Sequence, residues 1–172
     1  MTTPIVILGS SRSFGNTQKA VQLIIGGNQD IPIIDLKSLN ITPYDYTHRN
    51  KNDDCLPLME QALSHSLLIL ATPIYWYTMS AHMKIFIDRL SDFLSIRKDI
   101  GRKLRGKNLF VIASFETSLP KNFEDPFSHT CEYLGINYQG CSYIYFGKDS
   151  SLLVRNKAEI NKAQSVLLKV GS

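Results

Sequence analysis

Cysteine is scarce in this chain, and the few thiols that it has form no disulfide or metal-binding pattern. The 172 residues include three cysteines, Cys55, Cys131 and Cys141, which lie far apart and contain no C-x-x-C pair. This spacing predicts no disulfide framework and no zinc or iron–sulfur site. We therefore expect three buried free thiols, a pattern that suits the reducing cytoplasm.

Long apolar runs and dense charge are also missing. No apolar stretch approaches the ~20 residues that a membrane-spanning helix needs, and no basic segment precedes the short apolar run at the N-terminus. We expect a cytoplasmic protein without a membrane partner. The net charge is only +4, and the basic residues between 98 and 107 are split by glycines. This favours a solvated loop over a nucleic-acid surface, so we expect no nucleic-acid partner.

What the sequence does contain is a regular alternation of apolar runs with segments of helical periodicity. The runs predict strands over 4–8, 31–36, 67–71, 108–114 and 136–146. The periodic segments predict helices over 16–25, from 53 or 54 to about 66, and over 81–94, 123–134 and 151–170. The alternation predicts a single α/β domain over 1–172, with a five-stranded parallel sheet and helices on both faces.

The order of the strands is predicted from two of them. Pro32 favours an edge position for the second strand, because proline cannot donate to a sheet. The run 67–71 is the most apolar and belongs in the middle, which favours the order 2-1-3-4-5. Right-handed crossovers then bring the loops after strands one, three and four together at one end of the sheet.

The first of these loops has the composition of a phosphate site. Its glycines, Gly9 and Gly15, permit a tight turn and a close approach of the backbone. Its polar side chains are Ser10, Ser11, Arg12, Ser13, Asn16 and Thr17. Hydroxyls, an amide, a guanidinium and a helix N-terminus are the donors that a phosphate needs. An ordinary strand–helix turn capped by Asn16 or Thr17 is the alternative interpretation.

Several other phosphate-binding patterns are absent from this loop. It is neither a P-loop nor a G-x-G-x-x-G turn, although Asp35 leaves a dinucleotide interpretation open. No cysteine opens it, which excludes a low-molecular-weight tyrosine phosphatase. The acidic residues of a response-regulator receiver are missing after the first and third predicted strands.

The second loop, Pro73-Ile-Tyr-Trp-Tyr77, is rich in aromatic side chains. The side chains of such a loop offer an apolar wall for a flat ring system, and its backbone amides can form hydrogen bonds to the edge of the ring. The alternative is that Tyr75 and Trp76 pack a dimer contact or the base of their own loop.

These two loops, followed by Lys84-x-x-x-Asp88-Arg89, resemble the NADPH-dependent FMN reductase family. Small NAD(P)H:quinone and azo reductases and iron–sulfur flavoproteins are relatives of that family. The resemblance covers residues 5–94 and rests on element order beyond them. It implies a flavodoxin-like fold, a homodimer or homotetramer, and a structural or dimer-related role for Lys84, Asp88 and Arg89.

The resemblance also implies which residues bind the cofactor. The residues that match the FMN-phosphate loop are Ser10, Arg12, Gly15, Asn16 and Thr17. Those that match the segment along the isoalloxazine ring are Pro73, Ile74, Tyr75 and Trp76. Those that border the flavin in the third loop are Ser114, Phe115 and Glu116, where a glycine often seen in the family is missing.

The predicted function is that of an FMN-dependent NAD(P)H oxidoreductase. Hydride passes from NADPH or NADH to bound FMN and on to a small-molecule acceptor such as a quinone, azo compound or flavin, without a catalytic side chain or a metal. One alternative is a flavodoxin-like electron carrier, which the charge of +4 disfavours. The other is a non-enzymatic flavin-binding module. The loop 37–53, with Tyr44, Tyr46 and His48, either covers a flavin or partner or is solvated.

Overall fold

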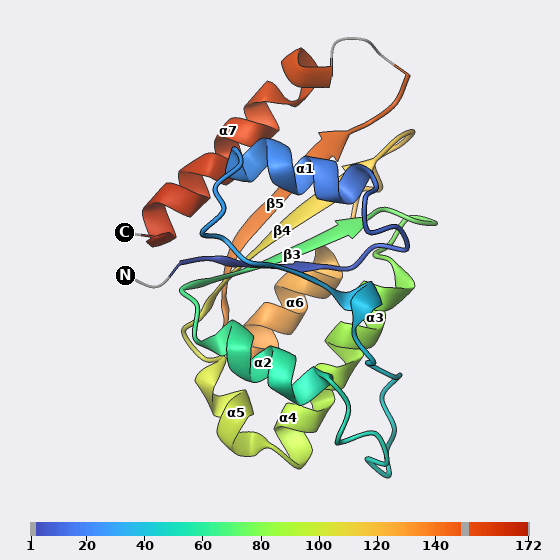
Figure 1. Cartoon of the computed structure of the whole chain (residues 1–172), viewed down its shortest axis with the longest axis vertical. Helices are drawn as coiled ribbons and strands as arrows, with labels where there is room; N and C mark the ends of the chain where they lie inside the picture. The colour runs from blue at the N-terminus through green and yellow to red at the C-terminus, as the bar shows by residue number, and fades with distance from the viewer. Residues whose placement is uncertain (1–2, 149–151, 172) are drawn as a thin grey trace.

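A computed structural model describes residues 3–148 and 152–171, and its centre is a five-stranded sheet (Figure 1). The strands are β1 (Ile5–Leu8), β2 (Ile33–Asp35), β3 (Leu67–Pro73), β4 (Asn108–Phe115) and β5 (Asn137–Tyr145). All neighbouring pairs are parallel, and the order is β2-β1-β3-β4-β5. The predicted fold class and strand order are confirmed.

Helices cover both faces of the sheet (Figure 1). On one face lie α1 (Asn16–Ile25) and α7 (Leu152–Gly171). On the other lie α2 (Cys55–Leu63), α3 (Ala81–Asp88), α4 (Asp92–Ser95), α5 (Lys98–Lys103) and α6 (Asp125–Leu134). Short 3₁₀ turns, η1 (Leu36–Ser38) and η2 (Arg89–Ser91), follow β2 and α3. Each face buries its own apolar cluster, and β1 and β3 are buried along their whole length, as central parallel strands are.

Two segments differ from the prediction. The helix expected over 81–94 is divided into α3, η2 and α4. The loop expected between 98 and 107 contains α5, because Ile100 and Leu104 are buried and hold a helical turn against the core. Gly101 makes this packing possible, since a Cβ atom there would lie 2.1 Å from the carbonyl oxygen of Phe93.

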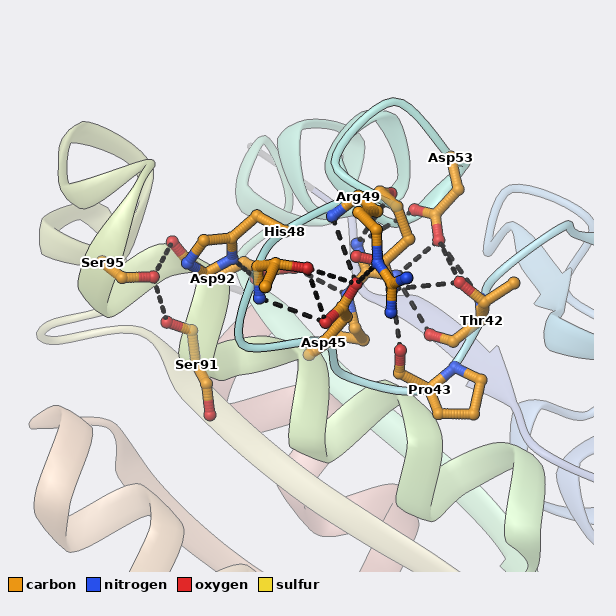
Figure 2. A network of polar contacts seen from close by, with 12 residues as sticks. Thr42, Pro43, Asp45, His48, Arg49, Asp53, Ser91, Asp92 and Ser95 are labelled. Carbon is orange, nitrogen blue, oxygen red and sulfur yellow. Dashed lines mark hydrogen bonds and ion pairs between the residues drawn. The ribbon is translucent and has the colours of Figure 1, made fainter.

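A buried arginine, Arg89, holds the long loop after β2 to the rest of the domain, and Figure 2 shows its partners Thr42, Asp53 and Asp92. The Arg89 side chain is 2% exposed and donates to both oxygens of Asp53 and to Asp92, the latter at 2.6 Å. It also donates to the carbonyl oxygens of Thr42 and Asn50 at 3.1 and 3.3 Å. Five hydrogen bonds from one guanidinium therefore fix the loop 39–54 against η2 and α4.

The charges in this network stabilise one another. Burial alone would lower the pKa of Arg89, but its hydrogen bonds to Asp53 and Asp92 raise it above the ordinary arginine value. Burial opposes ionisation of Asp53, yet hydrogen bonds from Arg89 and the backbone hold the pKa of Asp53 below its ordinary value. On the far side of Asp92, the Nδ1 atom of His48 lies 2.9 Å from its second oxygen. Arg89 is therefore a structural residue, as the family resemblance implied.

The three thiols are free and buried, as predicted. Burial raises the pKa of Cys55 and of Cys131 to about 12 and raises that of Cys141 well above its ordinary value. Within residues 3–148 and 152–171, no three His, Cys, Asp or Glu side chains gather as metal ligands do. None of the helices in these ranges is both long and apolar enough to cross a membrane.

Candidate functional site

The loops after β1, β3 and β4 enclose a pocket of about 320 Å³ at the carboxyl edge of the sheet. Its lining residues are Ser10, Arg12, Gly15, Asn16, Thr17, Pro73, Ile74, Tyr75, Ser114, Phe115, Glu116 and Thr117. Eleven of the twelve predicted cofactor-binding residues are in this lining. Trp76 is the exception, and Thr117, which directly follows the predicted third-loop residues, is an addition.

The amino end of α1 opens into the pocket without a side-chain cap. Gly15 is the N-cap residue and is in extended backbone, and no side-chain hydrogen bond caps the helix within the part of the chain that the structure describes. The N-cap that the alternative interpretation expected, Asn16 or Thr17, is therefore wrong. The Arg12 guanidinium has no ion-pair partner among the described residues. Uncapped N–H groups beside a free guanidinium have the chemistry to bind an anion.

The hydroxyls of the first loop divide into two groups. Ser10 and Thr17 are buried and line the pocket, whereas Ser11 is exposed and neither Ser11 nor Ser13 is in the lining. Composition alone could not separate them. The division follows from the turn at Gly15, whose N–H donates to the carbonyl oxygen of Arg12 at 3.2 Å.

Ser80 joins the first loop to the second. Its buried hydroxyl donates to the carbonyl oxygen of Gly9 at 2.6 Å and accepts from the N–H of Met83 at 3.2 Å, which caps α3. Gly9 is itself confined, since a Cβ there would lie 2.9 Å from the Cβ of Met83. The amino end of α3 therefore packs directly on the start of the phosphate-type loop.

Ser114 joins the third loop to the other two. Its Oγ lies 2.8 Å from the Oγ1 of Thr17, and its carbonyl oxygen accepts from the N–H of Ile74 at 2.9 Å. Nearby, the Asn16 amide donates to Glu116 at 2.8 Å. The third loop thus reaches the pocket although it has no glycine in the place where the family often has one.

The aromatic loop after β3 contains a strained two-residue turn. The N–H of Tyr75 donates to the carbonyl oxygen of Thr78 at 2.9 Å, and the reverse bond measures 3.1 Å. Between them Trp76 and Tyr77 have φ of 47° and 70°. Such turns need left-handed backbone at both central residues and strongly favour Asn-Gly. Trp76 is 92% exposed and is not in the pocket lining, so its predicted contact with the cofactor stays a prediction.

Replacing the turn by Trp76→Asn with Tyr77→Gly should raise the free energy of unfolding by about 1 kcal/mol. Left-handed backbone destabilises a bulky residue by about 1–2 kcal/mol, so the substitution removes this cost. The greater freedom of glycine in the unfolded chain offsets part of the stabilisation. Thermal denaturation should give an increase in Tm of about 2–4 °C. Tyr46→Asn removes an equally exposed aromatic from a loop without this turn and should leave Tm unchanged. A fall in Tm of the double variant would show that the aromatic pair stabilises its own turn.

The remaining residues singled out in the sequence lie outside the pocket. Lys84 and Asp88 form an exposed ion pair at 2.5 Å along α3. His82 begins the same helix and does not line the pocket. Neither do Tyr44 and His48, whose rings meet edge to face in the loop that Arg89 holds.

Comparison with known proteins agrees with this geometry. Residues 3–147 match the profile of the NADPH-dependent FMN reductase family. The chain belongs to this family. A Bacillus subtilis (strain 168) protein with the provisional name NAD(P)H-dependent FMN-containing oxidoreductase YwqN is 34% identical over 147 residues, covering 78% of this chain and 80% of the relative. The predicted family is confirmed, and with it an oxidoreductase that uses FMN and NAD(P)H.

Solved structures show the same fold. The Trp repressor binding protein of B. subtilis superimposes with a TM-score of 0.71 at 27% identity, covering 96% of this chain and 97% of that one. General stress protein 14 of Treponema denticola, solved in complex with FMN, gives a TM-score of 0.67 at 14% identity over 98% and 99% of the two chains. An archaeal flavodoxin gives 0.57 at 12% identity, covering 98% of this chain and 99% of that one, and shares the fold alone.

Proposed function

We propose that this chain binds FMN in the pocket between the three loops and passes hydride from NADPH or NADH to a small-molecule acceptor such as a quinone, azo compound or flavin. The observation that carries the proposal is the uncapped N-terminus of α1 beside the unpaired Arg12, facing a wall of Pro73 and Ile74. An anion site next to an apolar wall suits a flat ring that ends in a single phosphate.

The residues of the pocket fit the two ends of FMN. The first N–H groups of α1, the Arg12 guanidinium and the hydroxyls of Ser10 and Thr17 would hold the phosphate. Pro73, Ile74 and Tyr75 would lie along the ring, with Ser114 to Glu116 across from them. Bound FMN supplies the hydride chemistry, and the chain binds, orients and shields it. We infer that residues 1–172 act as one FMN-binding domain and form a homodimer or homotetramer.

A carboxylate in the pocket lining, next to the start of α1, gives a test of the pocket's electrostatics. Glu116 is exposed and bonds to Asn16 at the start of α1. Replacing it by glutamine keeps an acceptor for Asn16 but removes a negative charge that would repel the phosphate. FMN should bind about 2–5-fold more tightly at low salt, and less so as salt screens the charge. Equilibrium dialysis at two salt concentrations checks this, and weaker binding by the variant would contradict it.

The proposal as a whole is tested by purifying the protein, recording its spectrum with added FMN, and titrating NADPH without oxygen. We expect one FMN per chain and bleaching of the bound flavin by NADPH. Bleaching by a partner reductase but not by NADPH or NADH would favour an electron carrier. Full occupancy with no turnover of any acceptor would favour a non-enzymatic module. Failure to take up FMN would overturn the proposal.

A further inference from the structure

A second pocket, of about 530 Å³, lies at the opposite edge of the sheet from the candidate flavin site. Its lining residues are Phe93, Leu94, Lys98, Gly101, Arg102, Arg105, Tyr133 and Leu134. They come from α4, α5, the connection to β4, and the last turn of α6, next to the amino ends of β4 and β5. The flavin site adjoins the carboxyl end of β4. The two pockets are therefore separated by the length of this strand, which is about 25 Å for its eight residues.

The cations of this pocket have no anionic partner. Lys98, Arg102 and Arg105 are exposed and make no ion pair within the described residues. The neighbouring Arg97 is different, since it binds Asp99 at 2.9 Å and Glu60 at 3.2 Å. Asp99 is therefore already neutralised, and no carboxylate lines the pocket. Three positive charges converge on one space of ligand size.

The rest of the lining is apolar. Phe93 and Leu134 are buried beneath it, while Leu94 is 44% and Tyr133 is 79% exposed. Leu94 and Tyr133 therefore add apolar surface to the pocket that holds the unpaired guanidiniums. A simple inorganic ion would make no contact with that apolar surface. Guanidinium groups bind planar anions and also lie flat on rings, so the chemistry favours a ligand with both features.

Close backbone packing holds the two walls together. The N–H of Gly106 donates to the carbonyl oxygen of Gly135 at 2.8 Å, which ties the end of the α5 connection to the end of α6. Gly135 has φ of 72°, and a Cβ there would lie 3.1 Å from the Cγ of Arg105. The stem of Arg105 thus passes directly over the C-cap of α6, which places its guanidinium on the pocket.

We propose that this pocket binds a small organic anion, with its acidic group on Lys98, Arg102 and Arg105 and an apolar ring or short chain against Leu94 and Tyr133. The proposal is independent of the flavin site. It also gives the basic run between 98 and 107 a role that its sequence did not indicate, because α5 and the connection after it place three of its charges on one pocket.

The test is calorimetric titration of the protein with 1-naphthalenesulfonate, with one equivalent of FMN present to occupy the first pocket and no excess to compete for the second. We expect one molecule per chain with a Kd below about 1 mM, and binding at least about tenfold weaker for 1-naphthalenemethanol, which has no charge. Arg102→Gln with Arg105→Gln should weaken naphthalenesulfonate binding at least about tenfold.

Lys37→Gln with Lys51→Gln removes the same charge from exposed lysines elsewhere and should leave the affinity unchanged. The four substituted side chains are exposed, so equal Tm values will show that both double variants are folded. No saturable binding, or equal weakening by the two double variants, would overturn the proposal. The first result would mean a solvated basic face, and the second only a general charge effect.

Discussion

Replacing Arg89 by alanine is expected to lower the free energy of unfolding by about 3–5 kcal/mol. The substitution leaves the buried carboxylates of Asp53 and Asp92 without their cation, and frees the carbonyl groups that Arg89 holds in the loop 39–54. In a chain of this length, such a loss corresponds to a fall in Tm of about 6–20 °C. Thermal and urea denaturation measure it.

A control for this experiment lies one turn away on the same segment. Lys84→Ala breaks the exposed pair with Asp88 and should cost less than about 0.5 kcal/mol. Arg89→Lys keeps the charge but cannot donate to both carboxylates in the same way, so it should recover only part of the loss. If Arg89→Ala and Lys84→Ala gave the same Tm, the network would not stabilise the loop.

The second large effect is expected on cofactor binding. Replacing Arg12 and Thr17 together by alanine should weaken FMN binding about 100-fold. A charge-assisted hydrogen bond contributes about 1.5–3 kcal/mol and a neutral one about 1 kcal/mol, and 1.4 kcal/mol is tenfold in affinity. Both side chains line the pocket at the N-terminus of α1. Fluorescence titration with FMN measures the change.

Riboflavin separates the phosphate from the ring in this experiment, because it lacks the phosphate. Its affinity should be nearly the same for the double variant and the parent protein. Ser11→Ala with Ser13→Ala is the matched control, since these hydroxyls belong to the same loop but not to the pocket lining. Thr17 also bonds to Ser114, so Arg12→Ala alone should be compared as a variant at an exposed position. Equal losses for riboflavin and FMN would contradict the phosphate assignment.

The fold could be predicted because its evidence is local. The apolar run 67–71 and the proline before β2 determine the positions of central and edge strands, and the order follows from them. Helix α5 could not be predicted, because glycines at 101 and 106 indicate a break and only contacts with the core oppose it. Local patterns describe what a segment prefers, whereas packing decides what it adopts.

The residues of the site could be predicted from the sequence, but the contacts that join its loops could not. The motifs indicated eleven residues that do line one pocket. The positive φ of Trp76 belongs to the two-residue turn, and the composition of the loop does not predict that turn. The partners of Arg89 include Asp53, which is 36 positions earlier in the chain. The different role of Arg89 from that of Lys84 and Asp88 therefore becomes visible only in three dimensions.

The bonds made by Ser80 and Ser114 have a consequence for how the pocket fills and empties. They run between protein groups and are made without any ligand, so we expect the three loops to keep their positions when a ligand binds. The entropy of ordering these loops is lost during folding and not on binding. A ligand therefore meets a surface that is already in its final shape, and association should follow a single bimolecular phase without a slow rearrangement. The residence time of the flavin would then depend on its own contacts with the pocket and not on the opening of a loop.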